Sequence, residues 1–248
     1  MRTCSMISIS ALALLTLAAV PAFAQFTLDV ETGAVFSGYN DVRIPGKGGT
    51  LVSLSEDLST DPAWFYRLRL TYDFSDQHHL ALLYAPLTLD AAGTLDRALV
   101  YQGTTFPAQT PLDASYTFNS YRLTYRWDFH RSEALELGIG FTGKIRDANI
   151  TFAGNGISAE KTNVGFVPII HFRVLWRFSH PAAFLLEGDA LAAPQGRAED
   201  VLAALVVAVT ERIDVRAGYR LLEGGADNDE VYNFTLVHYT SVGAQIRF

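Results

Sequence analysis

The side chains best suited to chemistry are His171 and Asp189, which a tight turn would bring face to face. The turn reads Ser179-His180-Pro181, and a hairpin symmetric about it pairs His171 with Asp189 and Arg173 with Glu187. An imidazole held by a carboxylate is the general-base arrangement of many hydrolases. A hydrogen bond inside a polar interior explains the same pair and is the favoured interpretation. His171 and Asp189 are therefore the catalytic candidates only as the alternative to this structural role.

A second stretch that could do chemistry is the acidic segment that follows Gly224 and Gly225. Carboxylate oxygens are the ligands of hard divalent cations, so Asp227, Asp229 and Glu230 are the candidate metal ligands. The segment lacks the ligand spacing of an EF-hand, and a solvated acidic loop is the favoured interpretation. The sequence contains no nucleophile elbow, zinc-ligand set, phosphate loop or nucleotide fingerprint, so no cofactor is expected.

A larger set of charged side chains alternates with apolar residues along the chain and so falls on one face of each predicted strand. A hairpin turn about Arg131 would also place Arg126 opposite Glu136. Opposite charges that face each other across strands stabilise the pairing, so these residues predict a charge network inside the fold. The expected members are Arg67, Arg69, Arg122, Arg126, Glu136, Arg173, Glu187, Arg216 and Arg220.

The elements that must position these residues are strands, because hydrophobicity alternates with a period of two along most of the chain. Pro86 cannot donate to a ladder and predicts a break in the third strand. Tyr116 and Phe118 fall on the parity opposite to Tyr121, which predicts a bulge near Asn119. The predicted strands span about 26–39, 64–73, 78 through Pro86, 116–129, 135–146, 166–178, 184–189, 201–210, 213–221 and 232–248. The stretch 201–210 is apolar on both faces and is also consistent with a buried helix.

The lengths of the connections between strands predict that the two ends of the sheet differ. Those after the second, fourth, sixth and eighth strands are short, whereas most others are long, above all 40–62 and 88–115. Ser53, with Glu56 three residues later, predicts one or two helical turns in the first long loop. Aromatic residues gather at the end with the short turns, as in an interfacial girdle: Phe26, Tyr72, Trp127, Phe129, Trp176, Phe178, Phe184 and Phe248.

The last strand, Tyr232 to Phe248, ends on an aromatic residue, with Val242, Ala244 and Ile246 at every second position before it. This ending resembles the carboxy-terminal assembly signal of bacterial outer-membrane β-barrels. The resemblance implies a closed antiparallel transmembrane β-barrel of a Gram-negative bacterium, inserted by the barrel-assembly machinery and surrounded by lipid and lipopolysaccharide. An even number of strands keeps both termini on the periplasmic side, so ten strands are expected, with eight or twelve as alternatives.

The amino end agrees with a bacterial cell outer membrane location. Arg2, the apolar run Met6 to Val20 and the Ala22-Phe23-Ala24 site predict a secretory signal peptide over 1–24, which leaves 25–248 as the barrel domain. The formal net charge of −7 argues against nucleic-acid binding. A soluble β-barrel would show the same alternation with the faces reversed. The signal peptide, the terminal strand and the aromatic girdle together favour the membrane barrel.

The function expected from these features is a non-enzymatic, monomeric membrane component, either structural or a cell-surface protein whose long loops bind an external ligand that the sequence does not identify. A narrow, porin-like pore is the alternative, because the inward glycines Gly138, Gly140, Gly218 and Gly243 would leave space in the lumen. The second alternative is a hydrolase that uses His171 and Asp189. The ten-stranded outer-membrane proteases called omptins carry Asp and His at the outer rim, whereas the predicted outer loops here contain no histidine.

Overall fold

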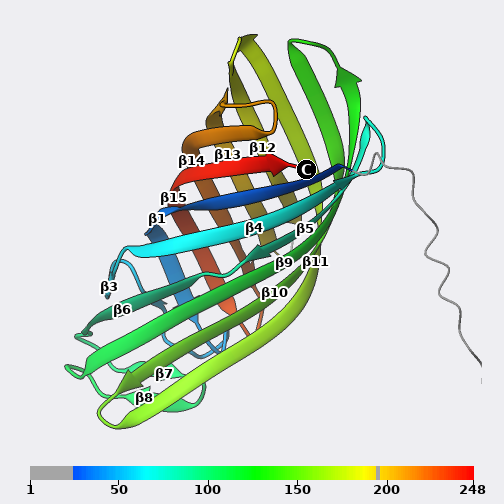
Figure 1. Cartoon of the computed structure of the whole chain (residues 1–248). Helices are drawn as coiled ribbons and strands as arrows, with labels where there is room; N and C mark the ends of the chain where they lie inside the picture. The colour runs from blue at the N-terminus through cyan, green and yellow to red at the C-terminus, as the bar shows by residue number, and fades with distance from the viewer. Residues whose placement is uncertain (1–24, 194–195) are drawn as a thin grey trace, which may run out of the picture.

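The computed structural model describes residues 25–193 and 196–248, so the predicted signal peptide over 1–24 lies outside the described residues. The chain is all-β and forms a closed antiparallel barrel of 10 strands (Figure 1). The pairing of β15 with β1 and of β9 with β10 completes the ring. The barrel strands are β1 (Gln25–Arg43), β4 (Ala63–Asp73), β5 (His78–Ala85) continued by β6 (Thr88–Thr94), β9 (Pro111–Arg131), β10 (Leu135–Gly154), β11 (Ile157–Ser179), β12 (Ala182–Ala193), β13 (Gly196–Ala208), β14 (Ile213–Asp227) and β15 (Tyr232–Arg247).

Side chains alternate between an apolar exterior and a polar interior along these strands. On β9, Tyr121 and Leu123 are 42% and 49% exposed, whereas Arg122 between them is 3% exposed. The exterior of the wall carries the largest exposed apolar residues, among them Trp64 at 82% and Phe166 at 70%. A soluble barrel buries its apolar face. Here that face is outside, which is the arrangement of a membrane-spanning barrel.

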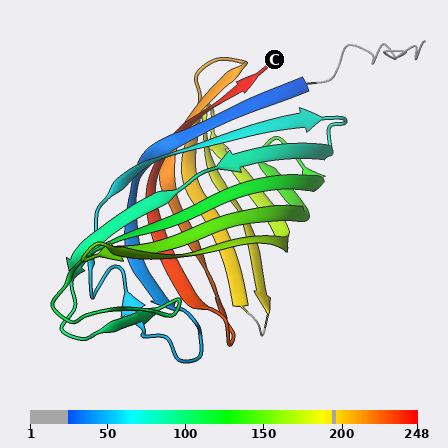
Figure 2. The same ribbon diagram turned by 90° about the horizontal axis from the view of Figure 1, so that it is seen from below.

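The two ends of the barrel differ, as expected. One end, called the turn end below, carries the short connections 74–77, 132–134, 180–181 and 209–212, together with the start of β1 and the end of β15. The predicted aromatic girdle is at this end, with Trp176 52% and Phe248 68% exposed. The opposite end, called the loop end, carries the long connections 44–62 and 95–110 (Figure 2).

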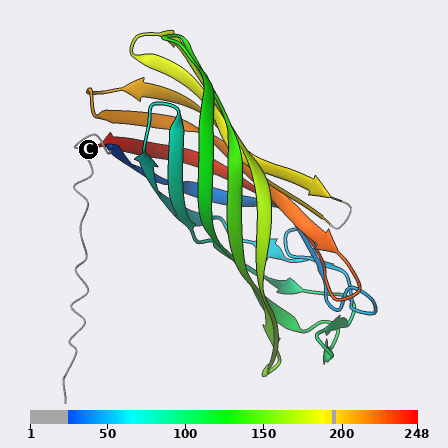
Figure 3. The ribbon, with the colours of Figure 1, turned by 90° about the vertical axis from the view of Figure 1, so that its right-hand side faces the viewer.

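The remaining described connections at the loop end are short, contrary to expectation. Residues 155–156 and 228–231 form tight hairpin turns. The strands themselves are longer than predicted, and β10 and β11 run far toward the loop end (Figure 3). Length at this end therefore comes partly from strands that continue the ladder, since β10 and β11 stay paired up to Gly154 and Ile157.

Two strand predictions are confirmed. Pro86 and Leu87 interrupt the third barrel strand, and β5 and β6 on either side both pair with β9. Residues 201–208 belong to β13, a strand rather than a helix. Among the described residues, no helix is long and apolar enough to cross a membrane.

Two register predictions are wrong. No bulge occurs near Asn119, because β9 pairs with β10 without a shift from Asp128 to Asp113. Tyr116 and Phe118 share the inward parity of Arg122, since the interior itself becomes apolar toward the loop end. Arg126 is opposite Gly140 rather than Glu136, because the register shifts between Leu137 and Gly138, close to the turn.

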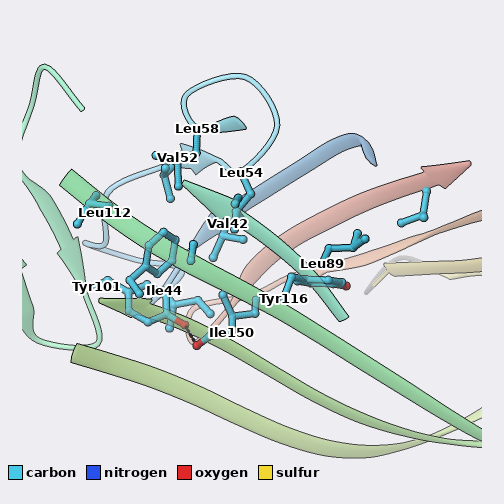
Figure 4. Packing of buried hydrophobic residues seen from close by; sticks show 14 of the residues in the cluster. Val42, Ile44, Val52, Leu54, Leu58, Leu89, Tyr101, Leu112, Tyr116 and Ile150 are labelled. Carbon is cyan, nitrogen blue, oxygen red and sulfur yellow. Dashed lines mark hydrogen bonds between the residues drawn. The ribbon is translucent and has the colours of Figure 1, made fainter. Parts of the chain in front are cut away.

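The apolar interior at the loop end combines inward side chains of the barrel strands with side chains of the two long loops, which fold over the barrel mouth. We call this cluster the apolar plug (Figure 4). The short strands within the loops are β2 (Val52–Ser53), β3 (Ser59–Thr60), β7 (Leu99–Tyr101) and β8 (Thr104–Phe106). Backbone bonds join the loops, from Thr50 N to Val100 O at 2.9 Å and from Gln102 N to Ile44 O at 3.0 Å. Of the one or two predicted helical turns, a single turn follows Ser53, with Asp57 N donating to Ser53 O at 3.0 Å. The predicted capping residue is wrong, because the backbone N–H of Ser53 donates to the Asp57 carboxylate rather than to Glu56.

Candidate functional site

The barrel interior at mid-depth is filled by a continuous set of ion pairs, which we call the charge layer. It lies between the apolar plug and the turn end, and strands on all sides of the barrel contribute to it. Its members are Asp29, Glu31, Arg67, Arg122, His171, Asp189, Asp200, Arg216 and Arg220.

Asp200 on β13 is the centre of the charge layer. Its Oδ2 accepts hydrogen bonds from Arg67 Nη2 at 2.9 Å and Arg122 Nη2 at 2.5 Å, and its Oδ1 accepts from Arg220 Nη1 at 2.5 Å. These side chains are all 5% exposed or less. Because β4 and β9 are not sheet neighbours of β13, the bonds from Arg67 and Arg122 cross the lumen and tie opposite walls together.

Two carboxylates of β1 hold the arginines of β14. Glu31 accepts from Arg220 Nε and Nη2, both at 2.7 Å. Asp29 accepts from Arg216 Nη1 at 2.6 Å and Nη2 at 2.7 Å. Bidentate pairs of this kind fix direction as well as distance. Since Arg220 also donates to Asp200, the layer is continuous from β1 to β13.

His171 and Asp189 occupy the register positions predicted for them. His171 Nδ1 is 3.0 Å from Asp189 Oδ1, which also accepts from Thr142 Oγ1 at 2.7 Å. Asp189 Oδ2 accepts from Arg122 Nη1 at 2.6 Å. His171 is 1% exposed, and none of the cavities described below is lined by it. The imidazole is therefore closed off from the vestibule and from the two small voids.

The turn end opens into a cavity of about 1100 Å³, which we call the vestibule. Arg69 Nη1 and Arg173 Nη1 both donate to Glu187, from opposite sides of its carboxylate. His79 is between two carboxylates, with Nδ1 2.5 Å from Asp73 Oδ1 and Nε2 2.8 Å from Asp128 Oδ2. Nearer the mouth, Glu136 accepts from Arg177 Nη2 at 2.7 Å. The vestibule is thus a charged, solvent-accessible chamber closed at its inner end by the charge layer.

The structure places all of the predicted network residues inside the barrel, in two groups. Arg67, Arg122, Arg216 and Arg220 belong to the charge layer, whereas Arg69, Arg126, Arg173, Glu136 and Glu187 line the vestibule. The prediction did not include Asp29, Glu31, Asp128, Asp200 and His79. The inward parity of Asp29, Glu31 and Asp128 was visible in the sequence. Asp200 was missed because it precedes the predicted strand 201–210, and His79 because it was assigned to a turn.

The lumen has little free space between the vestibule and the plug. Two voids of about 10 Å³ each border the charge layer, and each has room for about one water molecule. The glycines expected to leave space do not, because neighbouring groups fill it. A Cβ at Gly243 would be 3.0 Å from Arg216 Cζ, and one at Gly138 would be 2.4 Å from Asp128 Oδ1. A Cβ at Gly140 would collide with the backbone oxygen of Tyr125, and one at Gly218 with that of Ala203.

The acidic segment at 227–230 forms a turn that is held by hydrogen bonds to the side-chain amide of Asn228. Asn228 Oδ1 accepts from Glu230 N at 3.0 Å and from Val231 N at 2.9 Å. Among the described residues, no group of three or more His, Cys, Asp or Glu side chains is placed to hold a metal ion. Asp227, Asp229 and Glu230 are therefore not brought together as a ligand set.

Solved structures similar to this chain are outer-membrane β-barrels. OmpT, an outer membrane protease of Escherichia coli, is 10% identical with a TM-score of 0.53, over 90% of this chain and 97% of that chain. Ail of Yersinia pestis, in complex with the heparin analogue sucrose octasulfate, is 11% identical with a TM-score of 0.41, over 90% and 99%. Neisserial surface protein A is 14% identical with a TM-score of 0.36, over 90% and 97%. No protein family and no curated protein matches the sequence. At 10% identity the likeness to OmpT shows the fold alone, which is that of an outer-membrane β-barrel.

Proposed function

We propose that this protein is an integral component of the bacterial outer membrane whose lumen is closed, and that it acts through its two ends rather than as a pore or an enzyme. The apolar exterior supports the membrane location, because a charged side chain facing lipid costs roughly 2 to 4 kcal/mol at the bilayer midplane. The charged residues of the strands face inward instead. Lipid and lipopolysaccharide are then the partners of the wall, and the barrel-assembly machinery is the partner of β15.

The orientation follows from the two ends. Outer-membrane barrels have short turns on the periplasmic side, so the turn end with its vestibule faces the periplasm. The apolar plug then faces the cell exterior, where the polar sides of loops 44–62 and 95–110 form the surface that an external partner would meet. The exposed side chains of Lys47 and Glu56 belong to this surface.

The observation that carries the proposal is the double closure of the lumen. The charge layer leaves voids of about 10 Å³, and the plug beyond it contains the fully buried Tyr101 and Phe106. A hydrated ion needs a continuous water-filled path, and neither layer provides one. A pore would require both layers to open together.

Planar-bilayer recording tests this proposal. We expect the folded wild-type protein, inserted in the bilayer, to show no conductance steps above the baseline. Insertion is verified by protease protection, and a general porin measured in the same bilayer provides the positive control. Stepwise currents from the wild-type protein would contradict a closed lumen and favour the narrow pore.

A hydrolase is the second function considered, because OmpT has a similar fold and is a protease. The buried position of His171 argues against it, and the loop end of this chain carries no histidine. We expect His171→Asn to leave lipid and peptide turnover at the level of the wild-type protein, which should itself equal the blank. Turnover by the wild-type protein that His171→Asn abolishes would overturn the proposal.

A further inference from the structure

We propose that the vestibule binds an anionic amphiphile, a small molecule with a phosphate or carboxylate head group on an apolar body. The ligand would enter from the turn end. The head group would bind at the inner end of the vestibule, next to the charge layer, which we call the vestibule floor.

The head-group site is built from arginines whose hydrogen-bond donors outnumber the carboxylate oxygens that they contact. Arg69 and Arg173 each donate one hydrogen bond to Glu187, although a guanidinium carries about five donors. Arg173 Nε is buried without a partner in the part of the chain that the structure describes. These two guanidiniums therefore keep donors that a further oxyanion would satisfy.

A third guanidinium belongs to the same floor. Arg126 donates to Asp128 through Nε at 2.8 Å and Nη2 at 3.3 Å. Its side chain crosses over Gly138, where a Cβ would be only 3.0 Å from Arg126 Cδ. Gly138 is the register partner of Arg173, so the missing side chain lets Arg126 approach Arg173. The floor thus combines three guanidiniums with two carboxylates.

The acidic side chains on the opposite wall are already satisfied. Arg216 binds Asp29 through two nitrogens, and Arg247 binds Asp214 at 2.6 and 3.0 Å. Such bidentate pairs leave these carboxylates little residual charge to repel an anion. At the arginine floor, by contrast, Arg173 Nε is buried without a partner among the described residues.

An apolar strip lies beside the arginines. Leu175, Ala183 and Leu185 line the vestibule and are buried together in one cluster, with Val206 packed against it. Small-molecule sites commonly combine an apolar wall with a few polar groups that fix orientation. The arginines suit the head group and the strip suits a hydrocarbon body. Because the charge layer closes the inner end, the ligand would leave by the opening through which it entered.

Calorimetric titration tests the proposal with octyl phosphate, on the full barrel in nanodiscs of zwitterionic lipid. Both faces of a nanodisc meet the same solution, so the result does not depend on orientation or on conductance. We expect saturable binding at least tenfold tighter than that of inorganic phosphate, and none for octanol. Heats equal to those of empty nanodiscs would overturn the proposal.

Variants locate the site. Arg126→Gln should weaken binding at least tenfold, whereas Glu187→Gln should tighten it, because it removes the competing carboxylate. Gly138→Ala, which displaces Arg126, repeats the first test if Arg126→Gln fails to fold. The matched control Arg97→Gln, at the loop end, should leave the affinity unchanged. Unchanged affinity in folded Arg126→Gln and Gly138→Ala would overturn the proposal.

A final arm identifies the source of the head group. The titration is repeated in nanodiscs that contain phosphatidylglycerol. Weaker binding of octyl phosphate there would identify a membrane lipid as the competing ligand, whereas unchanged binding would identify a free amphiphile. Either result supports an anion site at the arginine floor.

Discussion

At mid-depth the lumen is filled by arginines and carboxylates that hydrogen-bond one another, whereas toward the loop end it is filled by apolar side chains such as Phe106 and Phe152, both 0% exposed. Inward-facing side chains of the same strands contribute to both regions, and the long loops add side chains such as Phe106 to the second. On β9, Arg122 belongs to the charge layer, and Tyr116, six residues earlier on the same face, belongs to the apolar plug.

The two fillings of the barrel depend on different forces. The charge layer bonds strand to strand, so each member fixes the position of several others, and removing one takes a hydrogen-bonding partner away from each buried side chain that it contacts. The plug depends on loops that contribute their own side chains, and it loses contact area when one is shortened. The layer is thus sensitive to chemical identity, whereas the plug is sensitive to shape.

The largest effect is expected for Asp200→Ala. This change leaves Arg67, Arg122 and Arg220 without their shared acceptor, so the free energy of unfolding should fall by roughly 3 to 5 kcal/mol. Urea titration of the reconstituted barrel measures it. Asp214→Ala is the matched control, because its partner Arg247 is 37% exposed, and such a pair is worth about 1 kcal/mol or less. Equal losses in the two variants would show that the buried Asp200 contributes no more to stability than an exposed ion pair.

A smaller effect is expected for Tyr101→Ala in the apolar plug. The change leaves a cavity beside Phe152 and removes the hydrogen bond from Tyr101 Oη to Ile150 O, at 2.8 Å. We expect a loss of roughly 3 kcal/mol. Hydrogen exchange should accelerate in loops 44–62 and 95–110 and not in the strands around Asp200. Tyr101→Phe, which keeps the ring, should cost only about 1 kcal/mol.

Both plug variants should remain silent in planar bilayers, because the charge layer still closes the lumen. Conductance in Tyr101→Ala would show that the plug alone seals the barrel, and it would reverse the order of importance of the two regions.

The smallest effect concerns the ion pair on the surface of the plug. Arg97 Nη2 is 2.7 Å from Asp57 Oδ2. Burial raises the pKa of Asp57, but hydrogen bonds from Arg97 and from Ser53 N outweigh it and hold the pKa below its usual value. The pair therefore stabilises the plug above the ordinary aspartate pKa of about 3.9, and the contribution is lost as the pH falls through the lowered value.

Arg97→Gln tests this pH dependence. The variant should lose about 0.2 to 1 kcal/mol at pH 7, as exposed pairs do. At a pH near 2 it should match the wild-type protein, as measured by hydrogen exchange in the loop that contains Asp57. A difference between the two proteins that does not change with pH would exclude the ion pair as its cause.

The alternation of polar and apolar residues predicted the strands and their faces, and the short turn at His180 predicted the register of its hairpin. Alternation is local, so Arg122 and Tyr121 could be assigned to opposite faces without any knowledge of the fold. The Ser179-His180-Pro181 turn likewise determined that His171 faces Asp189, because a short turn leaves few registers. The hairpin at Arg131 was harder, since a shift close to its turn moved Arg126 opposite Gly140.

Which inward residues meet across the lumen could be read only from the folded barrel. Asp200 contacts Arg67 and Arg122 because closure of the barrel brings β13 opposite β4 and β9, and strand periodicity contains no information about that distance. The inward position of Tyr116 was misread as a bulge for the same reason, because the apolar cluster that buries it joins side chains from distant strands and from loops folded over the mouth. Contacts between residues far apart in the chain depend on how the sheet closes, and closure is a property of all the strands together.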